Sequence, residues 1–468
     1  MKDKKWGLWF LTAFVVGNMV GGGVFMLPSN LANVSSPVGS TLAWIATGLG
    51  VFMIALVFGN LVMRKPELKG GPQSYAANLF SSPKAGKVAG YSMAWGYWAA
   101  NWAATASVII SFAGYLTTFF PVMESKDILF SVGDFQLEAG KFITFLVCSI
   151  VLWGIQAILQ RDINSAGNIN FITTAAKIIG FGLFIVVALS LFSASNLVST
   201  EFVNSKGINV GLGSQVNGAA IATLWAFIGI ESAVLLSNRA KSQKVVKKAT
   251  LLGLLISIVI YVGITLLAMG ILSTAQLQQS QKPLVDTLEM VIGHKGAYVM
   301  AILALISLLG STVGWIVVSA EVPYQAAKSG LFPQWFAKTN QNNSPARSLT
   351  LTNGLTQLFL FATISGTVSQ AYNFAIVVAT LAYLVPYFVT TVYQLKLIVT
   401  GETYDTIKGS RVKDGIIASL ALIYSLWVIK TGTADLKTFF LGIGLFVIGL
   451  LLYPILMRRG KRSTSAIK

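Results

Sequence analysis

Long apolar segments separated by short polar stretches make up almost the whole chain. Most segments are long enough for the roughly 20 residues that a helix needs to cross a bilayer. Lipid offers no partners to backbone amides, and the segments lack the alternation of barrel strands, so we expect helices. The pattern therefore predicts an all-α integral membrane protein with 12 transmembrane helices. The segments lie at 8–32, 38–63, 88–119, 140–159, 170–192, 214–237, 249–272, 297–322, 349–366, 371–395, 415–430 and 436–457.

Composition agrees with this interpretation and removes several kinds of chemistry. Hydrophobic residues make up 54% of the chain and charged residues 11%, against about 25% charged in soluble proteins. The first apolar segment is longer than the roughly 7–15 residues of a signal-peptide core, so no cleaved signal is expected. Cys148 and His294 are the single cysteine and histidine, which excludes an intrachain disulfide and clusters of cysteine or histidine that would bind a metal. We expect neither a metal nor a cofactor.

The net charge of +18 would suit a nucleic acid, but the placement of the charges indicates membrane topology instead. With the N-terminus in the cytoplasm, 26 of the 34 Lys and Arg residues fall in cytoplasmic stretches and seven on the other side. The remaining one, Lys177, lies inside a segment. Positive residues favour the cytoplasmic side. The split predicts cytoplasmic N- and C-termini in the plasma membrane, with the lipid bilayer and no nucleic acid as partner.

Three ionisable residues lie inside apolar segments, where each costs about 2.5–3.5 kcal/mol on insertion scales. Glu231, in "WAFIGIESA", is either a gating or proton-linked group beside a substrate cavity or a hydrogen-bond anchor for a bent helix. Lys177 is either a cation inside the bundle or a side chain that extends to the interface. Glu321 is either a water-reached interfacial carboxylate or part of a path for cations.

Two of the segments contain helix-breaking sequences at matching positions. In the first, "GNMVGGGVF" places Gly21–Gly23 in an apolar run, where each glycine costs roughly 1 kcal/mol against alanine. In the sixth, "FIGIE" places Gly229 before a carboxylate. Such paired interruptions indicate the binding site of a transporter. Helix packing through Gly17 and Gly21 is the alternative for the first.

The spacing of the two breaks predicts how the chain is organised. The breaks are five segments apart, an odd number, so the second set of five enters the membrane from the opposite side. We therefore expect an inverted repeat of five plus five helices. The predicted units are residues 1–195 for the first repeat, 196–396 for the second, and 397–468 for two further helices and a basic tail.

The chemistry of a broken helix suits an α-amino acid. Its exposed amides carry partial positive charge and bind a carboxylate, while its exposed carbonyls bind an ammonium group. Gly21–Gly23 would then hold the carboxylate and Trp225–Gly229 the amino group.

Four motifs resemble the amino acid–polyamine–organocation (APC) superfamily. They are "GNMVGGGVFMLPSNLA", "LWAFIGIESA", "GSTVGWIVVSAEVPYQAAKSGLFPQWFAKTN" and "LAYLVPYF". Within the superfamily the chain resembles the basic amino acid/polyamine antiporters, and "AEVPYQAAKSGLFP" is most similar to arginine/ornithine exchangers. The resemblance implies a LeuT-like fold with discontinuous helices 1 and 6.

The resemblance also implies a set of site residues. Trp225 would be an aromatic gate, Trp315 would pack on the aliphatic part of the substrate, and Glu231 would be linked to gating. Lys177 would replace the sodium ion of sodium-coupled relatives. The implied substrate-binding residues are Asn18, Gly21, Gly22, Gly23, Tyr97, Ala100, Asn101, Thr105, Trp225, Ile228 and Trp315.

This sequence departs from the family pattern at two of these positions. Gly22 stands where relatives carry serine, and Thr105 where they often carry asparagine, so the side chain of the substrate is the least defined property. The third segment also contains Trp98 and Trp102, which with Tyr97 could equally face lipid or pack in the core. Of these three aromatics, only Tyr97 is placed near the cavity.

The function predicted is alternating-access exchange of a basic amino acid such as arginine for ornithine or a related amine. Segments 1, 2, 6 and 7 would rock against 3, 4, 8 and 9. The alternatives are an amino acid/biogenic amine exchanger of a decarboxylation pathway and a proton-coupled amino-acid symporter. A channel is less expected, and saturable, slow flux would exclude it. An enzyme is also less expected, since no nucleophile–base pair or metal cluster occurs in the segments. Relatives are often homodimers, although no interface can be read from this sequence.

Overall fold

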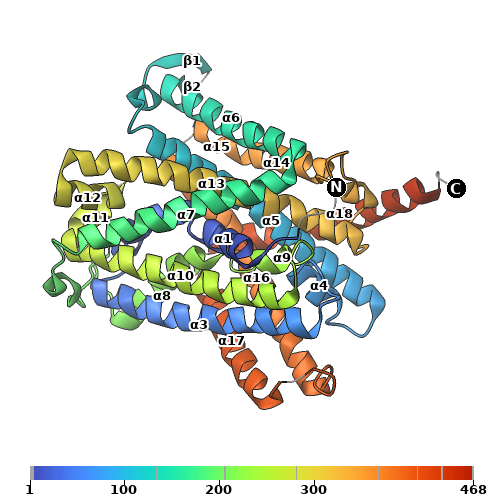
Figure 1. Ribbon diagram of the computed structural model, residues 1–468. Helices are drawn as coiled ribbons and strands as arrows, with labels where there is room; N and C mark the ends of the chain where they lie inside the picture. Colours follow the sequence, from blue (N-terminus) through green and yellow to red (C-terminus); the bar gives the residue numbers. More distant parts are fainter. Residues whose placement is uncertain are drawn as a thin grey trace.

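A computed structural model describes residues 5–132, 135–204, 207–280, 282–365, 368–407, 409–433 and 436–465. Within these ranges the chain is mostly helical, and its long helices lie side by side in one bundle (Figure 1). Nine helices of the described part are long and apolar enough to cross a membrane. Leu8–Met19 and Gly442–Leu456 are shorter apolar helices. The structure thus has the helical character expected of a multi-pass membrane protein.

The elements follow one another with short connections. The first half of the chain contains α1 (Leu8–Met19), the 3-10 helix η1 (Gly22–Phe25), α2 (Leu27–Ala32), α3 (Pro37–Arg64), α4 (Pro72–Ala77), α5 (Pro83–Leu116), η2 (Pro121–Glu124), β1 (Ile128–Val132), β2 (Phe135–Glu138), α6 (Ala139–Arg161), α7 (Ile163–Ala188) and η3 (Ala194–Leu197). The second half contains α8 (Leu212–Phe227), α9 (Ser232–Leu235), α10 (Gln243–Ile271), α11 (Thr274–Gln279), α12 (Pro283–Ile292), α13 (His294–Lys328), η4 (Gln334–Ala337), α14 (Ala346–Leu360), α15 (Ala362–Ser365), α16 (Val368–Thr400), α17 (Arg411–Gly432) and α18 (Leu436–Ser465).

Local sequence explains where several long helices begin. Ser36 caps α3 by accepting a hydrogen bond from the Gly39 amide at 3.1 Å, and Pro37 occupies the first helical position. Ser82 and Pro83 start α5 in the same way. A serine cap followed by proline is favourable because serine satisfies a free amide and proline has none to lose.

Both predicted breaks are present in the structure. In the first segment, α1 ends at Met19, Gly21 is extended at φ −105° and ψ −147°, and η1 begins at Gly22. In the sixth, α8 ends at Phe227, the chain turns at Gly229 and α9 begins at Ser232. Each of the other ten predicted segments overlaps one long helix or, at 349–366, the adjacent helices α14 and α15.

The glycine requirement differs between the two breaks. Gly229 has φ +109°, and a Cβ added to it would lie 3.0 Å from the Asn18 Cβ, so only glycine fits there without strain. Gly21 has a negative φ that any residue can adopt. The first break therefore depends on the low helix propensity of consecutive glycines rather than on a left-handed conformation.

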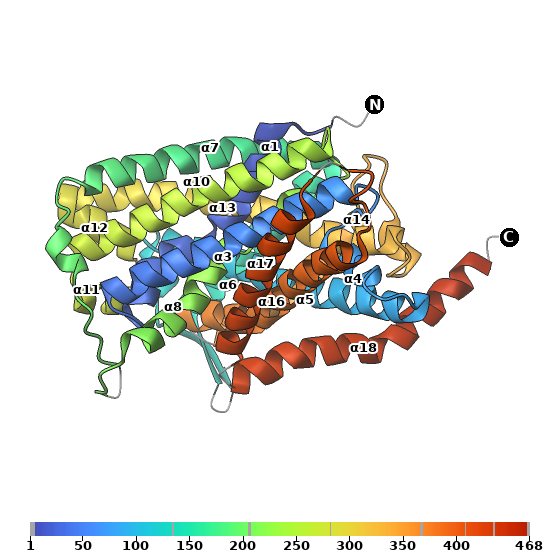
Figure 2. The ribbon, with the colours of Figure 1, turned by 90° about the horizontal axis from the view of Figure 1, so that it is seen from below.

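The apolar pattern did not predict the elements between the long helices. β1 and β2 form an antiparallel hairpin in which Val132 pairs with Phe135. The short helices α4, α11 and α12 connect longer ones. Figures 1 and 2 place α11 and α12 at one end of the bundle, whereas α1 begins and α18 ends at the other.

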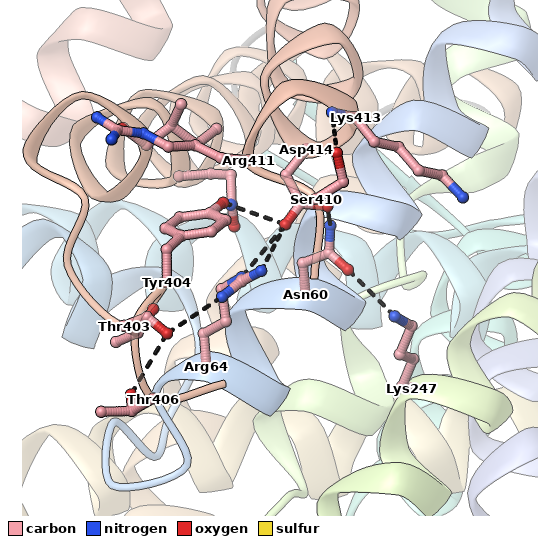
Figure 3. Close-up of polar contacts among 12 residues, drawn as sticks. Asn60, Arg64, Lys247, Thr403, Tyr404, Thr406, Ser410, Arg411, Lys413 and Asp414 are labelled. Atoms are coloured by element: carbon pink, nitrogen blue, oxygen red, sulfur yellow. Dashed lines mark hydrogen bonds and ion pairs between the residues drawn. The ribbon is translucent and has the colours of Figure 1, made fainter. Parts of the chain in front are cut away.

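A polar cluster ties α3 to α17 and to the loop before α17 (Figure 3). The Arg64 guanidinium lies 2.8 Å from Asp414 Oδ2 and stacks 3.7 Å above the Tyr404 ring. Asn60 donates to Asp414 Oδ1 at 3.0 Å and the Tyr404 hydroxyl donates to Oδ2 at 3.1 Å. Burial, and then the neighbouring Asp414 carboxylate, raise the pKa of Tyr404 to about 12, so this hydroxyl keeps its proton. We call these four residues the Arg64 cluster.

Candidate substrate site

A small cavity lies between the two breaks and is also lined by residues of α5 and α13. Its volume is about 20 Å³, on a scale where one water needs roughly 10–15 Å³. Side chains must therefore move before an amino acid can enter. The cavity is lined by Asn18, Met19, Gly21, Gly23, Ala104, Ser107, Val108, Trp225, Ala226, Ile228 and Trp315.

Three aromatic rings meet beside this cavity. Trp225, from the end of α8, and Trp315, from α13, each approach Tyr383 of α16, with ring centroids 6.1 and 6.0 Å apart. The Trp315 Nε1–H donates to the Asn18 backbone oxygen at 3.0 Å, which fixes the indole against the first break. Because aromatic faces attract cations, the two tryptophans can accept the charged or aliphatic part of a substrate side chain.

Asn18 links the two breaks directly. Its Nδ2 donates to Ser232 Oγ at 2.8 Å, so the last turn of α1 is bonded to the first residue of α9. Gly314 of α13 lies so close that an added Cβ would be 2.1 Å from Asn18 Oδ1. The close helix contact that Gly314 permits holds this asparagine in place.

Glu231 is fully buried at the start of α9 and has neutral hydrogen-bond donors around it. The Tyr97 hydroxyl donates to Oε1, the Tyr387 hydroxyl donates to Oε2 at 2.6 Å, and the Gly229 amide reaches Oε2 at 3.3 Å. The carboxylate thus joins α5, α16 and the second break through hydroxyl and amide groups.

Lys177 of α7 binds the end of α1. Its Nζ donates to the Val20 oxygen, to the Gly17 oxygen at 3.1 Å and to Ser311 Oγ at 2.7 Å. The carbonyl end of a helix carries partial negative charge, which suits an ammonium group. With 2% of its surface exposed, Lys177 lies inside the bundle and does not extend to an interface.

Glu321 of α13 is also fully buried, and it is paired with a cation. Its Oε2 accepts from Arg239 Nη2 at 3.0 Å, while Oε1 accepts from Asn238 at 3.0 Å and from Gln325 at 2.5 Å. This environment differs from the water-reached interfacial carboxylate considered above. The residue lies outside the lining of the cavity.

The α5 residues predicted for the site are not part of the lining of the cavity. Tyr97 binds Glu231, Asn101 Oδ1 accepts from the Tyr383 hydroxyl at 2.6 Å, and Thr105 shares a 3.1 Å hydrogen bond with Ser319. Ala100 is buried on the same helix. The α5 part of the lining consists of Ala104, Ser107 and Val108.

The two other aromatics of this helix belong to the protein interior. Trp98 and Trp102 are buried and form an edge-to-face pair with ring centroids 4.9 Å apart. The Trp98 Nε1–H donates to Thr352 Oγ1 of α14 at 2.9 Å. Core packing is therefore the alternative that holds for them.

Sequence reasoning missed several residues of this region. Tyr383 and Tyr387, four residues apart on α16, share one helix face, and both occur in the quoted motif "LAYLVPYF". Ser311 lies in "GSTVGW" and Ser232 follows Glu231 directly. A search for hydroxyl groups at helical spacing around the breaks would have found them. In the described part of the chain, no three His, Cys, Asp or Glu side chains gather as a metal site would require.

Comparison with known proteins now defines the class. Residues 7–453 match the sequence family described as amino acid permease, so the molecule is a membrane transporter and not an enzyme. The chain belongs to the amino acid permease family, which confirms the resemblance to the APC superfamily.

Several relatives match this chain over most of its length. A putative arginine/ornithine antiporter of Bacillus subtilis (strain 168) is 54% identical, covering 99% of this chain and 100% of the relative. An arginine/ornithine antiporter of Pseudomonas aeruginosa is 36% identical over 96% of this chain and 90% of the relative. One from Latilactobacillus sakei is 33% identical over 90% and 84%, respectively.

Proposed function

We propose that this protein is an antiporter that exchanges a basic amino acid, such as arginine, for ornithine or a related amine by alternating access. The names of its relatives support this proposal. The observation that carries it is the cavity between two interrupted helices, with Trp225 and Trp315 in its lining. A basic amino acid needs a site for its cationic side chain and a site for its zwitterionic end. The faces of the two indoles would provide the first, and the two helix breaks would provide the second.

The substrate would bind by its three functional groups. The amides of Gly21, Gly22 and Gly23 at the start of η1 would hold the α-carboxylate, because amides at a helix start favour anions. The carbonyls between Trp225 and Gly229 would hold the α-ammonium group. The cationic side chain would stack on the indoles, each cation–π contact contributing about 0.5–2 kcal/mol.

The surrounding residues would control access and coupling. Asn18 and Ile228 would close the cavity at the two breaks. Glu231 would be the gating or proton-linked group whose contacts change when α9 moves. Lys177 would occupy the place of a sodium ion, since its ammonium group already binds oxygens from α1 and α13. Tyr97, Ala100, Asn101 and Thr105 would support the lining from behind.

The same proposal covers the membrane arrangement. We assign twelve transmembrane helices in a LeuT-like inverted repeat, with repeats at 1–195 and 196–396 and two further helices at 397–468. Both termini would be cytoplasmic in the plasma membrane. The position of the start of α1 and the end of α18 at one end of the bundle supports an even number of crossings (Figure 2).

Proton-coupled amino-acid symport is the second candidate function. The observation that favours it is Glu231, a buried carboxylate whose donors are two hydroxyls and an amide. Such a group can gain a proton without first breaking an ion pair.

Transport in proteoliposomes tests the proposal. Purified protein is reconstituted, and uptake of labelled arginine is measured into vesicles that contain ornithine, arginine or buffer alone. Antiport predicts rapid uptake into loaded vesicles and little into empty ones. Uptake into empty vesicles driven by a pH gradient would establish symport instead. A counterflow screen of the twenty amino acids, ornithine, agmatine and common amines then defines the substrates.

A further inference from the structure

A second and larger cavity lies where the chain after α9 meets the end of α13. Its volume is about 380 Å³, within the range of about 300–1,000 Å³ of small-molecule sites. The wall contains Asn238 and Gln325, while Lys69, Lys328 and Ser329 are exposed at its rim. We call it the end pocket.

A buried carboxylate lies directly behind the wall of the end pocket. Asn238 and Gln325 both donate to Glu321 Oε1, at 3.0 and 2.5 Å. The other oxygen of Glu321 is bound by Arg239, whose side chain is 18% exposed while that of Glu321 is fully buried. The pocket therefore has negative charge behind its wall, and its rim carries two ammonium groups together with the exposed Glu67 carboxylate.

The contacts of Arg239 connect this ion pair to the segment before α1 as well as to the segment after α9. The Arg239 oxygen accepts from the Trp6 amide at 2.8 Å, and its guanidinium lies 5.8 Å from the Trp6 ring. Lys5 Nζ donates to the Asn238 oxygen at 2.7 Å. The segment before α1 and the segment after α9 are thus joined to one another, and the Glu321 carboxylate joins them to α13.

Separating these segments from α13 requires that Arg239 leave the Glu321 carboxylate. Leaving one member of a buried ion pair without its partner is strongly unfavourable, because an uncompensated charge then stays buried. Arg239 can leave Glu321 at lower cost if another cation takes its place. The guanidinium or ammonium group of a basic amino acid is such a cation, and the α-carboxylate of the same molecule would face Lys69 and Lys328.

We propose that the end pocket is a second binding site, selective for α-amino acids with a cationic side chain. The bound cation replaces Arg239 at Glu321 and thereby breaks the ion pair that helps to hold the segments before α1 and after α9 against α13. A neutral amino acid cannot make this replacement. The inference rests on the proposed function in that it assigns the pocket to the same class of substrate.

Protection of a single cysteine from alkylation tests the site. Ser329 is exposed at the pocket rim, and Cys148 is the single and buried cysteine, so Ser329→Cys in a Cys148→Ala background gives one reporter thiol. Arginine or ornithine at ten times its Kd should slow maleimide alkylation about tenfold, because only about one site in ten is then unoccupied. Citrulline, which has a similar shape and no side-chain charge, should not protect at the same concentration.

Two variants assign the protection to Glu321. Glu321→Gln should abolish protection by arginine, whereas Lys87→Gln, an exposed lysine outside the pocket, should leave it unchanged. If Glu321→Gln does not reach the membrane, Lys69→Gln/Lys328→Gln removes the rim charges and should weaken protection by arginine. Equal protection by citrulline, or protection that survives loss of these charges, would overturn the proposal.

A third variant separates the end pocket from the central cavity. Trp315→Ala alters the central cavity and should leave protection at Ser329→Cys unchanged. Loss of protection in Trp315→Ala would show that the central cavity produces the signal, which contradicts the proposal. If arginine protects the thiol but is not exchanged in vesicles, the result counts against the proposed function alone. If arginine is exchanged but does not protect the thiol, the result counts against the end pocket alone.

Discussion

Glu231 and Asp414 are both buried carboxylates, yet they have different kinds of partner. Asp414 binds the Arg64 guanidinium at 2.8 Å and also accepts from Asn60 and Tyr404 (Figure 3). Glu231 accepts from the hydroxyls of Tyr97 and Tyr387 and from a backbone amide. Asp414 therefore has a cationic partner, whereas Glu231 has neutral hydrogen-bond donors.

This difference indicates which contacts we expect to persist during transport and which we expect to change. A buried ion pair is costly to separate, because either ion alone is left without compensation. We therefore expect the Arg64 cluster to hold α17 against α3 throughout the proposed transport cycle. Hydroxyl donors satisfy a carboxylate while leaving it able to gain a proton or a cation. Under the proposed function, Glu231, next to the second break, would undergo such a change as α9 moves.

The largest expected effect is on stability, at the Arg64 cluster. Arg64→Ala leaves Asp414 buried without its cation and should lower the free energy of unfolding by about 3–5 kcal/mol. Thermal unfolding of the detergent-solubilised protein, followed by size-exclusion chromatography, measures the change. The matched control is Arg64→Ala/Asp414→Ala, which removes both charges and should be more stable than Arg64→Ala. A double variant no more stable than the single one would contradict a structural ion pair.

The second prediction concerns transport at Glu231. Glu231→Gln keeps the size of the side chain but cannot ionise, so exchange should fall at least tenfold, about 1.4 kcal/mol, with little loss of thermal stability. The pH profile of arginine exchange should also change. Exchange rates between pH 5 and 8 in proteoliposomes provide the measurement. A profile identical to that of the unmodified protein would remove Glu231 from proton-linked gating.

The third prediction addresses the aromatic lining. Trp315→Ala removes a ring that meets Tyr383 and lines the cavity. The apparent KM for arginine should rise several-fold, in line with a cation–π contribution of about 0.5–2 kcal/mol. Trp98→Phe, which changes a core tryptophan outside the lining, serves as the comparison at equal expression. Unchanged arginine uptake in Trp315→Ala would end its assignment to the substrate.

The smallest effect is expected from the ions in the buffer. Lys177 is a second fixed cation, bound to oxygens of α1 and to Ser311. If it replaces a sodium ion, then arginine exchange in sodium-free choline buffer should equal that in sodium buffer. A requirement for sodium, measured as an exchange rate that rises with the sodium concentration, would contradict this role of Lys177.

The sequence predicted the elements of the fold better than the contacts of the site. Apolar length located the long helices, and glycines located both breaks, because these signals are local. The partners of Glu231 come from α5 and α16, 134 and 156 residues away in sequence, and no local pattern specifies such a pairing. Likewise, the family resemblance implied Tyr97, Asn101 and Thr105 of α5 as site residues. Only packing shows that α5 contributes Ala104, Ser107 and Val108 to the lining instead.

The most direct test of the account is an experimental structure with arginine bound. We expect the α-carboxylate at the amides of Gly21–Gly23, the α-ammonium group at the carbonyls of Trp225–Gly229, and the guanidinium against Trp225 or Trp315. A structure with arginine bound elsewhere, or with the first and sixth membrane segments as uninterrupted helices around it, would contradict the account.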